Sequence, residues 1–170
     1  MARIPLVTDR STLDEGTAAV FDRIVETRGS LIPPFQVMLH VPDLAEKVAE
    51  VGQAIRSGAG LPPADRELVI LATGRALNCA FIWGSHLPHA LEAGVRPEAV
   101  AALQGAGQGL EAREAAVVSL VDELTGGGAV SDGVFRSLHR EFGTAGFVNL
   151  VVVVGYYTML AYAMSACHAC

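Results

Sequence analysis

A run of 22 residues without a charged side chain, residues 145–166, restricts the possible folds more than any other feature of the sequence. As one helix this run is long enough to cross a lipid bilayer, and it also suits the buried centre of a helical protein. Asn149 and Gly155 interrupt the run, and no lysine or arginine follows it. Other segments are almost as apolar, which indicates that several helices share one core. We therefore predict a buried central helix, with a membrane span as the alternative.

Proline and glycine residues divide the rest of the chain into helical segments. The predicted helices cover residues 18–27, 44–57, 64–77, 79–93, 97–103, 111–125, 132–142 and 146–167. Thr12, Asp43 and Asn78 are the predicted N-caps of the first, second and fourth of these helices. No segment alternates polar and apolar residues over the length of a strand. The sequence therefore predicts one all-α domain over residues 1–170, with about seven to eight helices.

Charged residues make up 18% of the chain and hydrophobic residues 51%, so few charged side chains are available to cover an apolar surface. Exposed apolar patches usually mark subunit interfaces, and we therefore expect a homo-oligomer. The net charge of −6 and the lack of any lysine or arginine cluster argue against nucleic-acid binding. Residues 1–10 lack the long apolar run of a signal peptide, so we expect a cytoplasmic protein. Its three cysteines are too few and too clustered for a disulfide scaffold, and we expect them to be reduced.

Three residues of the central segment could carry chemistry. Cys79 is predicted in the first turn of a helix, where free N–H groups and the helix dipole stabilise a thiolate. His86 follows on the same face, about 10 Å further along the helix. Glu67 lies on the preceding helix and shares a face with Gly74, which would let the next helix approach closely. If that face is buried, the pKa of the carboxyl group is expected to rise toward working pH. Each residue also has a structural interpretation, as an inert thiol, a core histidine or a first-turn acid.

Several short segments occur in a characteristic order, at residues 65–68, 79–86, 90, 94, 122–125 and 154–159. Together they resemble the carboxymuconolactone decarboxylase family, whose superfamily also holds the alkylhydroperoxidase D proteins. The resemblance covers nearly the whole chain, with a core motif at residues 64–94. It implies an alkylhydroperoxidase D-like bundle of helices that assembles into trimers or hexamers. It also implies that Glu67, Cys79 and His86 act together as catalytic residues around one pocket.

The chain departs from the family pattern at two positions. The peroxidase branch has a second cysteine three residues after the first, and here Ile82 occupies that position. Residue 82 is the one position that would touch both Cys79 and His86, so thiol–disulfide cycling within the motif is excluded. Many decarboxylase-like members have tyrosine and glutamate where this chain has Phe81 and Ile82. We expect these two side chains and Trp83 to form an apolar substrate-binding pocket.

The end of the chain offers two more thiols. Cys167 and Cys170 could pair with each other, or one of them could reach Cys79, and their structural interpretation is a disordered tail with incidental thiols. A metal site would have to use His86 and His89 with Cys79 upstream. No further ligand motif completes that set, so we expect no metal and no other cofactor.

Three functions remain open at this stage. In the leading hypothesis the protein is a cofactor-free, decarboxylase-like enzyme in which Glu67 and His86 move protons on a small cyclic acid, lactone or enolisable ketone. Decarboxylation and double-bond isomerisation both pass through an enolate, which needs only a proton donor and an electrostatic cradle. The second hypothesis is a thiol-dependent alkyl hydroperoxide reductase that uses Cys79. The third is a non-catalytic homologue that binds a small molecule, which the apolar residues Phe81 and Ile82 favour.

Overall fold

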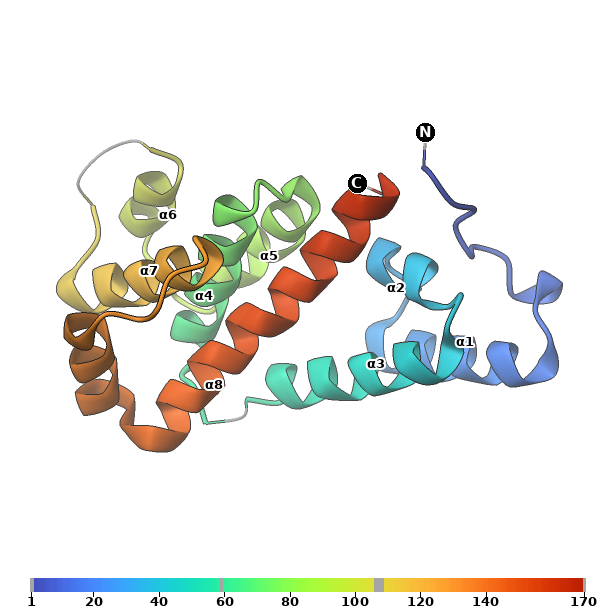
Figure 1. Ribbon diagram of the computed structural model, residues 1–170, viewed down its shortest axis with the longest axis horizontal. Coiled ribbons are helices and arrows are strands. Elements are labelled where there is room, and N and C mark those ends of the chain that lie inside the picture. The colour runs from blue at the N-terminus through green and yellow to red at the C-terminus, as the bar shows by residue number, and fades with distance from the viewer. Residues whose placement is uncertain (1, 59, 106–108, 170) are drawn as a thin grey trace. The chain divides into compact units, whose positions relative to one another are not determined.

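The computed structural model of the chain describes residues 2–58, 60–105 and 109–169. These residues form eight α-helices and one 3-10 helix, with no strand among them (Figure 1). The helices are η1 (Arg10–Thr12), α1 (Glu15–Arg28), α2 (Pro33–Met38), α3 (Pro42–Arg56), α4 (Pro63–Ala76), α5 (Ala80–Glu92), α6 (Pro97–Leu103), α7 (Ala112–Thr125) and α8 (Asp132–Cys167). The predicted all-α fold is therefore confirmed.

The contacts within the chain divide it into two compact units. The first consists of Met1–Ser57 and Met159–Cys170 and holds α1, α2, α3 and the end of α8. The second, Gly58–Thr158, holds α4 to α7 and the larger part of α8, and it includes the whole core motif. A single domain with two parts and a pair of separate domains can both divide in this way. The single-domain organisation over residues 1–170 therefore stays a prediction.

The start of α1 differs from the predicted one. Asp14 is the N-cap, and its carboxylate accepts a hydrogen bond from the N–H of Thr17 (3.0 Å). The prediction of Thr12 as this N-cap is wrong, because Thr12 ends the η1 turn, where its hydroxyl donates to the carbonyl of Asp9 (2.8 Å). Gly29 ends the helix in the left-handed conformation (φ 78°), which glycine adopts without strain.

Prolines begin both α2 and α3 in the first unit. In α3, Pro42 takes the first helical position and Val41 is the N-cap. The prediction of Asp43 as the N-cap is therefore wrong, and this acid lies in the first turn instead. A carboxylate in the first turn still interacts favourably with the helix dipole.

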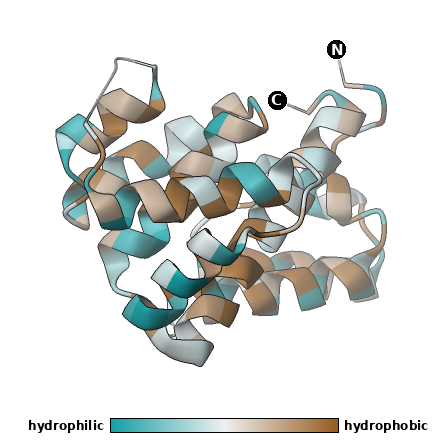
Figure 2. Cartoon of the chain, turned by 60° about the vertical axis from the view of Figure 1, so that its left-hand side comes forward, coloured by the Kyte–Doolittle hydropathy of each residue, from teal (hydrophilic) through white to brown (hydrophobic). Residues whose placement is uncertain are grey.

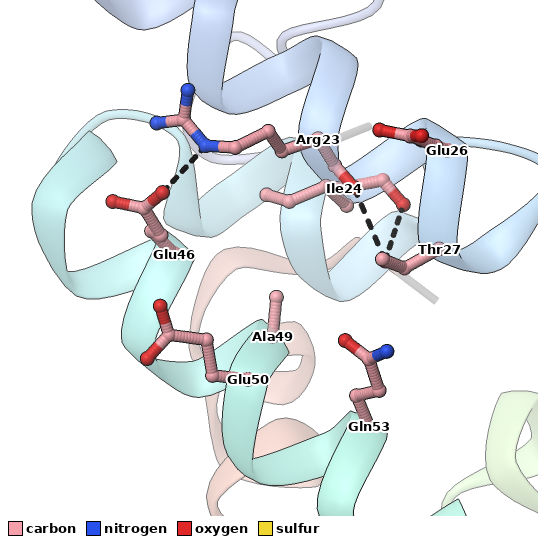
Figure 3. Close-up of a pocket in the computed structure, with 8 residues that line it drawn as sticks. All are labelled: Arg23, Ile24, Glu26, Thr27, Glu46, Ala49, Glu50 and Gln53. Atoms are coloured by element: carbon pink, nitrogen blue, oxygen red, sulfur yellow. Dashed lines mark hydrogen bonds and ion pairs between the residues drawn. The ribbon is translucent and has the colours of Figure 1, made fainter.

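Helices α1 and α3 pack on each other, and a hollow of about 190 Å³ lies between them (Figure 3). The buried side chains of Ile24 and Ala49 contribute apolar surface to it. Carboxylates add negative charge, from Glu26, Glu46 and Glu50. Arg23 Nε donates to one of them, Glu46 Oε1, at 2.5 Å. No pattern in the sequence predicts this hollow.

In the second unit, α4 is buried over most of its length, as its apolar sequence predicts. The buried residues include the run 68–74 and also Asp65. The helix packs on α5 and on α7. Two ion pairs join it to α7, one between Asp65 and Arg113 (2.5 Å) and one between Arg75 and Asp122. Helix α4 is therefore the element around which the second unit is built.

Helix α5 approaches α4 closely at Gly74. A Cβ atom built on this glycine would lie 3.0 Å from Ile82 Cγ2 and 3.2 Å from the backbone nitrogen of Trp83. Both distances are shorter than ordinary packing contacts, so the space beside residue 74 is already filled by α5. The close approach predicted at this position is confirmed.

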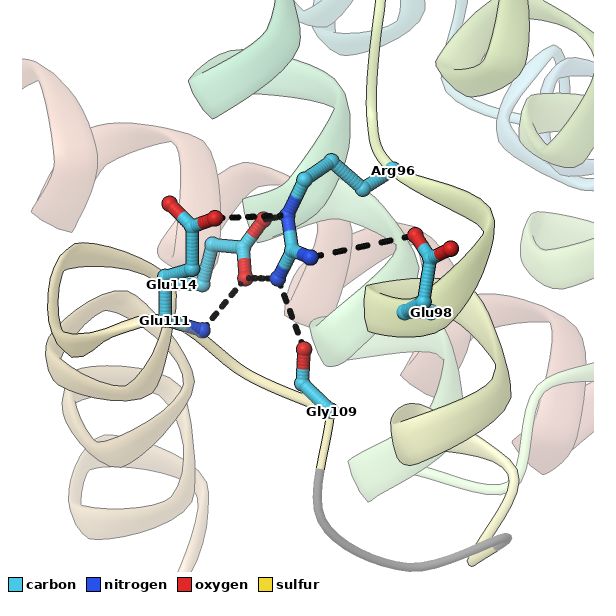
Figure 4. A network of polar contacts seen from close by, with 5 residues as sticks. All are labelled: Arg96, Glu98, Gly109, Glu111 and Glu114. Atoms are coloured by element: carbon cyan, nitrogen blue, oxygen red, sulfur yellow. Dashed lines mark hydrogen bonds and ion pairs between the residues drawn. The ribbon is translucent and has the colours of Figure 1, made fainter.

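Arg96 joins α6 to the start of α7 (Figure 4). Its guanidinium donates two hydrogen bonds to Glu114 (2.6 and 3.0 Å) and one to the carbonyl of Gly109 (2.7 Å). Glu111 and Glu114 also form a capping box at the start of α7. The carboxylate of Glu114 therefore caps α7 and also binds Arg96, the residue before α6.

Helix α8 contains a break at Gly143 (φ 66°, ψ −176°), which separates the two helices predicted over residues 132–142 and 146–167. By length and composition alone α8 could cross a membrane. Of its apolar 18-residue segment, 44% is buried in the protein. The core helix of a soluble protein passes the same test, so this feature does not separate the two alternatives. Leu150 is buried and Val152 is exposed, so the predicted central helix has one covered face and one open face.

Hydrophobic residues occur along most of the helices (brown in Figure 2). Large ones are exposed at Val41, Leu44, Val51, Leu91, Phe135, Val148, Val152, Met159 and Tyr162. This pattern agrees with the apolar composition that led us to expect subunit contacts. The homo-oligomer itself stays a prediction.

Replacement of Gly74 by alanine tests the packing of α5 on α4. Alanine favours a helix by about 1 kcal/mol over glycine, but overpacking a filled site costs about 1–3 kcal/mol. We expect Gly74→Ala to lower the free energy of unfolding by about 1 kcal/mol in urea titrations. Gly84→Ala is the matched control, because no atom beyond the adjacent residues and the backbone of α5 itself lies within 4 Å of a Cβ built at this position. It should raise the free energy of unfolding, and equal stability of the two variants would contradict the close packing.

Candidate active site

Glu67 and His86 form a hydrogen-bonded pair between α4 and α5. Glu67 is 6% exposed, and its Oε2 lies 2.9 Å from His86 Nδ1. The other carboxylate oxygen, Oε1, lies 3.4 Å from Arg66 Nε. Both oxygens of this buried acid therefore have a partner. The structure brings together two of the three residues predicted to be catalytic.

The environment of Glu67 lowers its pKa below the ordinary value of 4.5. Burial acts in the opposite direction and is the largest single effect, but the hydrogen bond and charge of His86, together with Arg66, outweigh it. The raised pKa expected from the sequence is therefore wrong, because that expectation considered burial without the two basic partners. Glu67 is an ionised carboxylate at neutral pH.

The charge on Glu67 determines which nitrogen of His86 carries a proton. An ionised carboxylate only accepts hydrogen bonds, so Nδ1 of the imidazole is the donor. In the neutral ring, Nε2 is then the free proton acceptor. The His86 side chain is 18% exposed, so the ring is buried only in part. A histidine oriented by a carboxylate in this way is suited to act as a general base and acid.

Two aromatic rings lie against the imidazole of His86. Tyr157 of α8 meets it at 5.0 Å between ring centroids and at 89° between planes. His89 lies at 6.2 Å and 68°. No pattern in the sequence singles out Tyr157, because no spacing links a residue of α8 to one of α5. Its only signal was the resemblance of segment 154–159 to a later helix of the family, which marks the segment and no residue in it.

Cys79 is the N-cap of α5, one residue before the predicted first turn. Asn78 before it has a left-handed conformation (φ 50°). The N–H of Cys79 donates to the carbonyl of Gly74 (2.8 Å), and that of Asn78 donates to the carbonyl of Arg75 (3.0 Å). These bonds form a Schellman motif that ends α4. The prediction of Asn78 as the N-cap of α5 is therefore wrong: asparagine suits both positions, and here it closes the preceding helix.

Cys79 lines a hollow at the start of α5 that does not contain the Glu67–His86 pair. Cys79 is 5% exposed and lines a hollow of about 240 Å³ at the start of α5. The other described lining residues are Gly74, Arg75, Asn78, Ala80, Trp83, Leu103 and Gln104. Glu67 and His86 are not among them. Seven residues of helix separate the thiol from the imidazole by about 10 Å, too far for a direct hydrogen bond.

The three predicted substrate-binding residues lie in different surroundings. Trp83 lines the thiol hollow beside Cys79. Ile82 is 1% exposed and packs against Gly74, in the contact between α4 and α5. Phe81 is half-buried. Of the three, Trp83 alone lines the hollow beside Cys79 in the described part of the chain.

Cys167 belongs to the first unit of the chain. Cys167 is half-buried at the end of α8, and its carbonyl accepts a hydrogen bond from the N–H of Arg3 (2.8 Å). Cys170 lies outside the described residues, and its pairing with Cys167 or Cys79 stays a prediction. Over the part of the chain that the structure describes, no group of three or more His, Cys, Asp and Glu side chains could hold a metal ion.

The sequence model of the carboxymuconolactone decarboxylase family matches residues 42–131, more than half of the chain. The chain belongs to the carboxymuconolactone decarboxylase family. The matched residues include Glu67, Cys79 and His86, and the family expected from the sequence is confirmed. A search of curated proteins found no match.

Two solved structures have the same fold. The apo form of the debrominase Bmp8 is 16% identical with a TM-score of 0.76, and the match covers 97% of this chain and 90% of that one. A cysteine-to-alanine variant of Bmp8 in complex with 2,3,4-tribromopyrrole is also 16% identical, with a TM-score of 0.75 and coverage of 99% and 92%. At this identity the likeness shows the fold alone. This member of the carboxymuconolactone decarboxylase family therefore has the fold of an enzyme.

Replacement of Glu67 by glutamine tests the charge on this residue. Because its pKa is lower in the folded chain than in the unfolded one, the unfolded chain binds the proton first as the pH falls. The stabilisation by the carboxylate is therefore complete above pH 4.5 and is lost as the pH falls through the lowered pKa. We expect Glu67→Gln to be less stable than the wild type at neutral pH, with a difference that shrinks in acid. Urea unfolding from pH 3 to 7 measures it, with Glu92→Gln on the exposed end of α5 as the control. A difference that grows in acid would contradict the lowered pKa.

Proposed function

We propose that the protein is an enzyme that transfers protons on a small organic molecule without a cofactor. His86 is the proton carrier, and Glu67 holds the imidazole in one tautomer. The observation that carries this proposal is the 2.9 Å hydrogen bond between Glu67 Oε2 and His86 Nδ1. The proposed substrates are small cyclic acids, lactones and enolisable ketones.

In the proposed reaction, His86 Nε2 takes a proton from the carbon next to a carbonyl group. The electron pair of that C–H bond moves into the enolate, and the imidazole becomes an imidazolium ion. The negative charge of Glu67 stabilises this ion, since it lies at hydrogen-bond distance. Return of the proton to another carbon completes an isomerisation. In a decarboxylation, loss of carbon dioxide forms the enolate, and a protonated His86 supplies the proton that ends it.

The comparisons support a small organic substrate. The family is named for a decarboxylase that acts on a carboxylated lactone, and loss of carbon dioxide beside a carbonyl group leaves an enolate. One structural neighbour was solved with 2,3,4-tribromopyrrole, a small cyclic molecule.

A second candidate function is peroxide reduction by the thiol of Cys79. It is favoured by the position of Cys79 at the N-terminal end of α5 and on a hollow with Trp83. In this reaction the thiolate attacks the peroxide, the O–O bond breaks, and a sulfenic acid and an alcohol form. A thiol from outside the motif then condenses with the sulfenic acid, which releases water and forms a disulfide, and a second outside thiol reduces that disulfide back to the Cys79 thiol. The thiols must come from outside because Ile82 occupies the position of a nearby second cysteine.

Deuterium exchange from solvent into lactones and ketones, followed by NMR, tests proton transfer without knowledge of the natural substrate. We expect His86→Asn to lower the exchange rate by at least about 100-fold, the usual contribution of a general base. Glu67→Gln should also lower it, because the amide does not fix the tautomer. Cys79→Ser should keep most of the rate, and so should the control His139→Asn, at a histidine whose Nε2 lies 3.0 Å from Thr144 Oγ1.

The same variants separate the alternatives. Loss of alkyl hydroperoxide consumption in Cys79→Ser, with no exchange by the wild type on any probe, would favour the thiol reaction. Unchanged exchange in His86→Asn would refute the proposed role of the imidazole. Binding of the probes without exchange or peroxide consumption would favour a non-catalytic homologue.

A further inference from the structure

Tyr157 contacts the imidazole of the proposed proton carrier from a third helix. Its ring centroid lies 5.0 Å from that of His86, and the two planes are nearly perpendicular at 89°. An edge-to-face pair at this distance is one of the favoured geometries of aromatic rings. The contact joins α8 to α5, whereas the hydrogen bond of Glu67 joins α4 to α5. The imidazole is therefore held from two different helices.

We propose that Tyr157 is a positioning residue, whose ring fixes the plane of the His86 imidazole and thereby the direction in which Nε2 points. This inference rests on the proposed function, in which Nε2 exchanges the proton with the substrate. A single hydrogen bond at Nδ1 determines which nitrogen faces Glu67. It leaves the ring free to tilt about that bond, because the outer torsion of a histidine side chain has a broad energy minimum. A perpendicular ring against the imidazole restricts this tilt.

Tyr157 is itself held in place. It is 4% exposed, and the ring of Tyr156 packs against it at 5.2 Å and 81°. Val153, one turn earlier in α8, is also buried. In a close-packed interior such a ring has no space to turn away. A contact built on a helix also holds its geometry better than one on a loop.

The chemical part of Tyr157 that matters in this proposal is its ring and not its hydroxyl group. Tyr157→Phe keeps the ring and should behave like the wild type. Tyr157→Met fills a similar volume with a flexible chain but lacks a ring, and Tyr157→Leu is a second exchange of this kind. Phe147→Met is the matched control, because it removes a half-buried ring from the same helix that contacts Phe135 and lies ten residues before Tyr157.

The first measurement is the solvent exchange of the His86 Nδ1 proton, followed by NMR in the free protein and assigned with His86→Asn. An aromatic pair of this kind contributes a factor of roughly 2 to 10 to an equilibrium. We therefore expect the proton to exchange about 2 to 10 times faster in Tyr157→Met than in the wild type. Tyr157→Phe and Phe147→Met should leave it unchanged. An unchanged rate in Tyr157→Met and Tyr157→Leu would overturn the proposal, and so would equal acceleration in Tyr157→Phe.

The second measurement is the rate of deuterium exchange into the probe that responds best to the wild type. Tyr157→Met should lower kcat by a similar factor and leave KM nearly unchanged, because the ring acts on the proton carrier and not on the substrate. Restoration of kcat in Tyr157→Phe would support the proposal, whereas a change in KM alone would contradict it. If the wild type exchanges no probe, the proposed function fails, and the NMR measurement still decides the role of Tyr157.

Discussion

Helix α5 can lie close to α4 because residue 74 has no side chain. Ile82 and the backbone of Trp83 fill the space that a Cβ atom would need. Gly74 lies near the end of α4 and meets the start of α5, whereas Glu67 lies near the start of α4 and meets His86 one turn further along α5. The two helices therefore run in opposite directions as a tight hairpin. The proposed chemistry depends on packing at a residue that takes no part in it.

The buried acids of α4 show how the same helix serves both the fold and the site. Burial raises the pKa of Asp65, and Arg113 of α7 acts against this effect without cancelling it. Two residues later, His86 and Arg66 outweigh burial and lower the pKa of Glu67. Asp65 joins α4 to α7, and Glu67 joins α4 to α5. An acid that faces a structural arginine and one that faces a titratable imidazole are thus separated by less than one turn.

Much of this fold could be predicted from the sequence because helix ends are marked locally. Proline at the start of α4 and α6 and glycine after α1 act through the backbone of their own residues, so these limits were predicted closely. The caps were harder, because several residues compete for one position. Asp14 displaced Thr12, and Asn78 closes α4 where it was expected to open α5. The choice between such residues depends on hydrogen bonds that form only when the helices are in place.

The candidate site could be predicted only in part. Residues 67 and 86 lie on successive helices, and the small Gly74 indicated that these helices approach each other. The sign of the pKa shift in Glu67 could not be predicted, because it depends on the balance between burial and the distances to two bases. Tyr157 could not be predicted from spacing either, since its contact with His86 joins helices that are far apart in the chain.

Ile82 occupies the position of the second cysteine of the peroxidase branch, and its side chain is needed for the packing of α5 on α4. This side chain is almost completely covered, and its methyl group fills the gap left by Gly74. A cysteine in its place would be smaller by two non-hydrogen atoms and would leave a void between the two helices. Its sulfur would also sit in the hairpin contact, shielded from any peroxide or reductant in solution. Conversion of this chain into a two-thiol enzyme would therefore require a larger side chain on α4 as well.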